Sequence, residues 1–193
     1  DGRIVIVDVD ERSLSAVGQW PWRRDVIGRL IDSLRERGAA TVALDIMFPE
    51  ADRFEGSGLS PDTVLSESLR RGGVILGYGL LFDQTREAPR PCVKHALGLP
   101  IIGSPGVQAD EPFFEATSAV CNIPTLTTAA QASGFLHAAP DPDGILRRAP
   151  LLMQYDSRVY PALSLAAVRS VTDAQDLVLR VANVNTAAPR LDG

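Results

Sequence analysis

Three aspartates that end or interrupt apolar runs are the residues of this chain best suited to chemistry. Asp8 and Asp10 end the first run, and Asp45 lies inside a second run at residues 41–48. Carboxylates that gather at one edge of a sheet can coordinate a divalent cation through oxygen or act as general acid and base. Alternatively, they accept hydrogen bonds from loop amides or pair with arginines, which is a structural role. Both interpretations stay open at this stage.

A predicted strand–helix–strand unit would bring these aspartates together. Residues 4–7 are consecutive β-branched residues, which is typical of a strand buried on both faces in the middle of a sheet. An apolar stripe within residues 26–34 predicts a helix, and residues 41–48 predict a second buried strand. A crossover of this length makes the two strands parallel. The aspartates should therefore meet at the sheet edge where open α/β folds usually bind ligands.

The remaining patterns predict an α/β fold: a mixed, mainly parallel central sheet flanked by helices, with a distal antiparallel β-hairpin. Ser60 followed by proline predicts the start of another helix, and residues 74–82 predict a third strand. Two apolar runs on either side of the proline, aspartate and glycine turn at residues 140–144 predict the hairpin. Residues 162–171 predict a further helix, whereas residues 83–112 predict a long loop.

Composition narrows the class of protein. The chain has 193 residues, 45% of them apolar and 22% charged, which suits one folded domain over residues 1–193. Its net charge of -5 argues against a nucleic-acid partner. No membrane span, dinucleotide fingerprint or convincing metal-ligand set is visible, so we predict neither metal nor cofactor. Cys92 and Cys121 allow one disulfide without demanding it.

Aromatic and basic residues add further candidates. Trp20 and Trp22 flank Pro21 just before the helix at residues 26–34, and their indoles could wall a pocket or fasten the helix to the sheet. Arg147 and Arg148 could clamp an anion, but alternation along a strand allows at most one of them to face a given site. The candidate ligand-binding residues are Asp8, Asp10, Trp22, Arg24, Asp45, Asp143 and Arg147.

Several stretches together carry a family pattern in one order along nearly the whole chain. They are residues 4–14, Gly18, 20–24, Gly38, 42–48, 134–135, 140–144, 147–151 and 160–165. This pattern resembles the second type of CHASE domain, an extracytoplasmic sensory module of bacterial membrane receptors. The family usually has proline where this chain has Arg23, which is a small departure.

The resemblance implies a sensor domain cut from a larger membrane protein. Its members lie on the periplasmic or extracellular side of the bacterial inner or cell membrane, between an amino-terminal anchor and several carboxyl-terminal spans. The resemblance implies neither a ligand nor a catalytic activity. The signalling enzyme, a histidine kinase or an adenylate or guanylate cyclase, would lie inside the cell.

Our leading hypothesis is therefore a non-enzymatic sensor domain in which an unknown small-molecule or protein signal shifts the relative position of the chain ends. We expect a homodimer in the receptor. One alternative is a cation-dependent phosphohydrolase using Asp8 and Asp10, because an apolar strand ending in Asp-x-Asp resembles haloacid-dehalogenase-like phosphatases. However, Arg12 stands where that motif has threonine. The other alternative is a dimerisation or protein-docking module without a pocket. The sequence leaves open the ligand, the output domain and the oligomeric state of the isolated domain.

Overall fold

The computed structural model describes residues 3–54, 58–82, 95–98, 101–103, 113–137, 143–174 and 177–181. Its helices are α1 (Glu11–Val17), α2 (Arg24–Glu36), α3 (Pro61–Arg70), α4 (Pro124–Ala129) and α5 (Leu163–Thr172). Its strands are β1 (Val42–Leu44), β2 (Val74–Leu81), β3 (Ile101–Gly103), β4 (Glu115–Ala116), β5 (Ser118–Val120), β6 (Ala132–Phe135), β7 (Leu152–Tyr155), β8 (Arg158–Pro161) and β9 (Leu179–Val181). The predicted long loop at residues 83–112 lies largely outside this description. None of the helices described is long and apolar enough to cross a bilayer.

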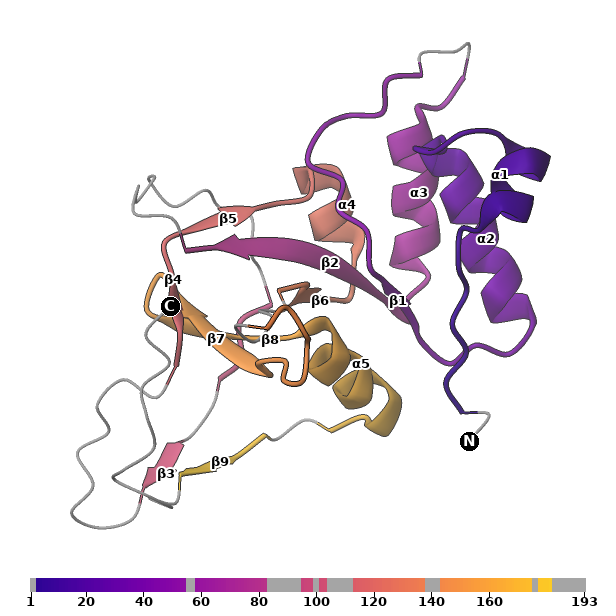
Figure 1. The fold of residues 1–193 in the computed structure, drawn as a ribbon. Helices are drawn as coiled ribbons and strands as arrows, with labels where there is room; N and C mark the ends of the chain where they lie inside the picture. The colour runs from indigo at the N-terminus through magenta and orange to yellow at the C-terminus, as the bar shows by residue number, and fades with distance from the viewer. Residues whose placement is uncertain are drawn as a thin grey trace.

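Strand β2 organises the molecule. It pairs in parallel with β1 and β6 and in antiparallel with β5. In Figure 1, β2 runs diagonally through the middle, with α2, α3 and α4 on one side and β7, β8 and α5 on the other. The predicted mixed, mainly parallel α/β sheet is therefore confirmed.

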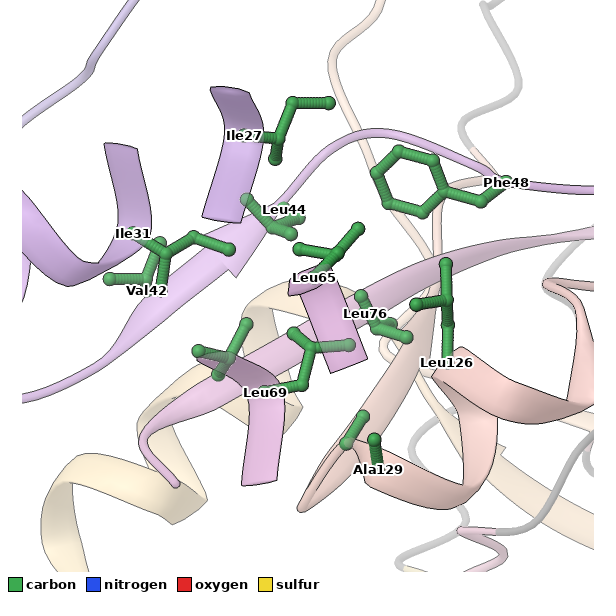
Figure 2. Close-up of a cluster of buried hydrophobic side chains, with 12 residues drawn as sticks. Ile27, Ile31, Val42, Leu44, Phe48, Leu65, Leu69, Leu76, Leu126 and Ala129 are labelled. Carbon is green, nitrogen blue, oxygen red and sulfur yellow. The ribbon is translucent and has the colours of Figure 1, made fainter. Parts of the chain in front are cut away.

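The helices on the first side form the larger core with the inner faces of β1 and β2. Ile31, Leu65 and Leu69 are fully buried, and they pack with Leu44 and Leu76 from the two strands. Figure 2 shows these side chains converging between the helices and the sheet. Truncating one of them to alanine removes buried apolar surface and leaves a cavity, at a cost of about 2–5 kcal/mol. The apolar stripe predicted within residues 26–34 is thus confirmed as the buried face of α2.

A second core lies below the carboxyl half of β2. It is built from β2, β6, β7 and β8 and includes Tyr78, Phe135, Met153 and Tyr160. Gly134 brings α5 directly onto β6, because a Cβ at this glycine would lie 2.5 Å from the backbone of Leu163. No residue with a side chain fits there without moving the helix.

The helix starts follow their sequence signals. Ser60 caps α3 by accepting a hydrogen bond from the Thr63 backbone N–H at 3.2 Å, and Pro61 occupies the first turn as predicted. The predicted helix at residues 162–171 is confirmed as α5.

The first predicted strand is wrong. Residues 4–7 form no strand, and the side chains of Ile4, Val5, Ile6 and Val7 are 88%, 78%, 88% and 51% exposed. A run of β-branched residues indicates only that these side chains would pack well on the surface of a β-sheet. It does not specify a neighbouring strand, and within the described residues β1 pairs with β2 alone.

The predicted position of the distal hairpin is also wrong, although the fold contains such a hairpin. Strand β6 pairs in parallel with β2, and residues 143–151 contain no strand. The hairpin joins β7 to β8, and its turn residues Asp156 and Ser157 have φ of 49° and 59°. Two consecutive residues with positive φ match the right-handed twist of a tight hairpin. The turn at residues 140–144 lies partly outside the described residues.

Candidate functional site

Asp10 has a structural role. Its Oδ1 accepts hydrogen bonds from the Ser13 backbone N–H at 2.8 Å and from the Ser13 hydroxyl at 2.7 Å. These bonds cap α1 and lower the pKa of Asp10, because they favour its charged form. The carboxylate is therefore engaged at a helix start.

The predicted cluster of Asp8, Asp10 and Asp45 does not form a metal centre. All three residues are exposed. Among the residues described, no three His, Cys, Asp or Glu are grouped so that they could hold a metal ion. The physical reason is the missing strand at residues 4–7, which was to place Asp8 beside Asp45. Ligand binding by these residues stays a prediction, and the phosphohydrolase alternative gains no support from their arrangement.

Arg24 lies in a buried network rather than in a pocket. Its guanidinium binds the Asp62 carboxylate and the Glu50 backbone carbonyl, and its backbone N–H donates to Asp52 Oδ2 at 2.8 Å. The central carbon of its guanidinium, Cζ, also lies 5.1 Å from the centre of the Phe48 ring. This network ties the segment after β1 to the starts of α2 and α3. Arg24 therefore has a structural role in this network, and ligand binding by Arg24 stays a prediction.

Trp22 is held locally. Its Nε1 donates to the Gly18 carbonyl at 2.7 Å, and its ring packs edge to face with Trp20 at a centroid distance of 5.9 Å. The pair braces the connection between α1 and α2. The structural role predicted for the indoles was to fasten the helix to the sheet, whereas the contacts described here are local to this connection. Ligand binding by Trp22 stays a prediction.

Asp143 and Arg147 do come together. Two hydrogen bonds of 2.9 and 2.8 Å join the guanidinium to both carboxylate oxygens. These bonds, and one from the Ile145 backbone N–H at 3.1 Å, lower the pKa of Asp143. The two side chains are 53% and 50% exposed, so they form a bidentate charged pair on the surface.

A small polar cavity lies beside β2, where no site was predicted. Leu76 and Tyr78 of β2, Ser133 of β6 and Thr127 of α4 line it, together with His95, Asn122 and Ala130. It has room for about one water molecule. Polar side chains from segments far apart in the sequence therefore meet around this small space, which Leu76 and Ala130 also line.

The polar groups around this cavity are largely held by one another or by backbone. His95 Nδ1 lies 2.9 Å from Ser133 Oγ, and Asn122 Nδ2 donates to the Gly77 carbonyl at 2.8 Å. The exception is the Tyr78 hydroxyl, which is buried without a hydrogen-bond partner among the described residues. Burial raises the pKa of Tyr78 because the charged form is poorly solvated there. A tyrosine hydroxyl is protonated at neutral pH even at its ordinary pKa, so this group is a hydrogen-bond donor there.

A comparison with protein families identifies the family of this chain. A family model described as CHASE2 domain matches residues 1–191. The chain belongs to the CHASE2 domain family. This family consists of extracytoplasmic sensory domains, so the resemblance drawn from the sequence is confirmed. A search of curated proteins and a search of solved structures found no match.

In this CHASE2 domain, sequence reasoning missed the cavity because none of its polar residues belongs to a motif. His95 stands alone in its segment, and Asn122 precedes α4 without a pattern around it. Two weak signals were present. Ser133 interrupts a short buried strand, and Tyr78 lies between Gly77 and Gly79 in an otherwise aliphatic run.

Proposed function

We propose that this CHASE2 domain is the signal-input domain of a transmembrane receptor, such as a sensor histidine kinase or an adenylate or guanylate cyclase. The family match over residues 1–191 carries this proposal. The domain itself would be non-enzymatic and would lie on the periplasmic or extracellular side of the membrane. Cys121 is disulfide-bonded, which supports an oxidising compartment because such bonds are rare in the bacterial cytosol.

A small polar ligand would be sensed at the cavity beside Tyr78 in a conformation in which this cavity is wider, because in the present structure it has room for only about one water molecule. A buried donor without an acceptor costs about 1–3 kcal/mol. A ligand atom that accepts a hydrogen bond from Tyr78 would recover this free energy in the bound conformation only. Ligand binding would thereby favour one arrangement of β2, β6 and α4 over another, which is the requirement for a signal. The exposed residues Asp8 and Asp45 and the pair of Asp143 with Arg147 remain second candidates for the ligand contact.

The test is a thermal-shift screen of the purified domain against divalent cations, nucleotides, amino acids, sugars and small anions. A ligand that binds the folded state must raise the melting temperature. We expect one class to do so, and we expect Tyr78→Phe to abolish the shift while Asp8→Asn and Asp45→Asn retain it. A shift lost in the two Asn variants but kept in Tyr78→Phe would move the site to the predicted sheet edge.

The second candidate function is a dimerisation or docking module, and the exposure of residues 4–7 favours it. Exposed apolar surface of this kind often marks an interaction site. No thermal shift with any ligand class, together with dimers at micromolar concentration in sedimentation, would support this module. A homodimer is also our proposal for the assembled receptor, so dimers alone would not exclude sensing.

A further inference from the structure

The amino-terminal segment has the composition of a buried strand but lies outside every sheet. Ile4, Val5 and Ile6 are each at least 78% exposed, and Val9, further along, is only half-buried. Figure 1 shows this segment as an extended trace leading into α1, with no strand beside it. Apolar β-branched side chains in an extended segment are suited to pair with the open edge of a sheet.

Strand β1 offers such an edge. The Val42 N–H donates to the Gly73 carbonyl at 2.8 Å, so the backbone groups of Val42 face β2. Because successive residues of a parallel strand direct their backbone groups to opposite sides, those of Ala43 and Asp45 face away from β2. Within the described residues no strand pairs with that side of β1. The edge therefore presents backbone donors and acceptors in strand geometry.

Apolar surface flanks this edge. Val168 and Val171 of α5 are 59% and 62% exposed. The Thr41 hydroxyl lies 3.0 Å from the Ser170 hydroxyl, which places the end of α5 beside the start of β1. A strand added beside β1 would thus have apolar neighbours on the face of the sheet that α5 covers.

We propose that residues 4–9 dock in parallel on the open edge of β1, and that the exposed arrangement in the structure is the released member of a two-state pair. The connection through α1 and α2 has the length of a parallel crossover. It also keeps the segment at a high effective concentration beside its own edge, which favours the same chain over a second copy.

The two states are balanced by opposing interactions. Docking buries the apolar side chains of residues 4–7 and satisfies the edge groups of Ala43 and Asp45. It also brings Asp8 to the end of the sheet that carries Asp45, where like charges on neighbouring strands repel. This step rests on the proposed receptor function. In such a receptor, residues 4–9 follow the amino-terminal anchor, so a signal that favours one of the two states would move the chain at that anchor.

Hydrogen exchange of the backbone amides tests docking in the chain itself. We expect the Ala43 and Asp45 amides to exchange at least tenfold more slowly in the wild type than in Ile6→Asp, because a charge inside the docked strand disfavours it. Ile145→Asp is the matched control, since Ile145 is 52% exposed in a segment without strand, and it should leave the exchange unchanged. Protection of the Leu76 amide in all variants shows that the fold is intact.

Two results would overturn docking. One is that, in the wild type, the Ala43 and Asp45 amides exchange as fast as amides that have no protection. The other is protection that increases with protein concentration, which would make a second copy the occupant. The role of docking in signalling is tested separately from docking itself. If Ile6→Asp removes the protection but leaves receptor output unchanged, docking is supported and its role in signalling is refuted.

Discussion

Asn122 Oδ1 accepts a hydrogen bond from the backbone N–H of Phe48 at 2.7 Å, which joins the segment after β1 to the segment before α4. The same amide donates to the Gly77 carbonyl of β2 at 2.8 Å. Asn122 is only 6% exposed, so its side chain replaces water for two separate parts of the backbone. One buried amide thus fixes the border between the larger core and the polar cavity.

Removing this amide should destabilise the domain. Asn122→Ala leaves the Phe48 N–H and the Gly77 carbonyl without their partner, and each unsatisfied buried group costs about 1–3 kcal/mol. Urea unfolding followed by circular dichroism measures the loss. Asn122→Asp keeps the acceptor for Phe48, but it loses the donor to Gly77 and buries a carboxylate beside that carbonyl, so it should also destabilise the domain. A free energy of unfolding equal to the wild type in both variants would show that water replaces the amide.

Breaking the buried pair of Arg24 and Asp62 should have a larger effect. Their side chains are 10% and 14% exposed, and removing one partner of a buried pair costs about 3–5 kcal/mol because the other charge stays unpaired. We therefore expect Arg24→Met to lower the free energy of unfolding by about that amount. Arg29→Met is the control, because Arg29 is 65% exposed and pairs with Asp25 on the surface. Equal losses in both variants would contradict the structural role of Arg24.

The domain should lose stability at alkaline pH through Tyr78. Burial raises the pKa of Tyr78 above its ordinary value of 10.0, so the unfolded chain releases this proton at a lower pH than the folded chain does. The free energy of unfolding should then be level below about pH 10 and fall as pH rises further. Urea unfolding at several pH values should show a shallower fall in Tyr78→Phe. Burial also raises the pKa of Tyr160. Tyr160 therefore accounts for part of the fall in stability that remains in Tyr78→Phe. Identical pH profiles in wild type and variant would refute this assignment.

Reduction should destabilise the domain through Cys121. This residue is disulfide-bonded, and the only other cysteine of the chain is Cys92, which lies outside the described residues. We expect peptide mapping without reductant to recover Cys92 and Cys121 in one linked peptide. Dithiothreitol should lower the free energy of unfolding by about 2–4 kcal/mol. Cys121→Ser should be insensitive to dithiothreitol; a similar response in this variant would mean that the reductant acts elsewhere.

The sequence predicted those elements whose signals are local. The stripe containing Ile27 and Ile31 predicts α2, and the cap at Ser60 predicts α3, because both patterns depend on neighbours within a few residues. The pairing of strands is not local in this sense. Residues 4–7 have a strand composition without a pairing partner, and β6 pairs with β2 instead of forming the expected hairpin.

The candidate site was harder to predict for the same reason. Of the seven residues proposed, Asp143 and Arg147 contact each other, but the sequence analysis listed them as separate candidates and did not predict this pair. The cavity depends on His95, Asn122 and Ser133, which are distant in sequence and meet only through the packing of β2, β6 and α4. Their spacing in the sequence therefore gives no indication that these residues lie together in the fold.

The close approach at Gly134 has a mechanical consequence. Because the backbone of Leu163 leaves no space above this glycine, the start of α5 cannot slide along β6, and the two elements must move together. Strand β6 carries Ser133 at the cavity and is hydrogen-bonded to β2, while the other end of α5 lies beside β1. Helix α5 therefore joins two distant parts of the sheet: its start lies against Gly134 of β6, next to Ser133 at the cavity, and its end lies against the start of β1.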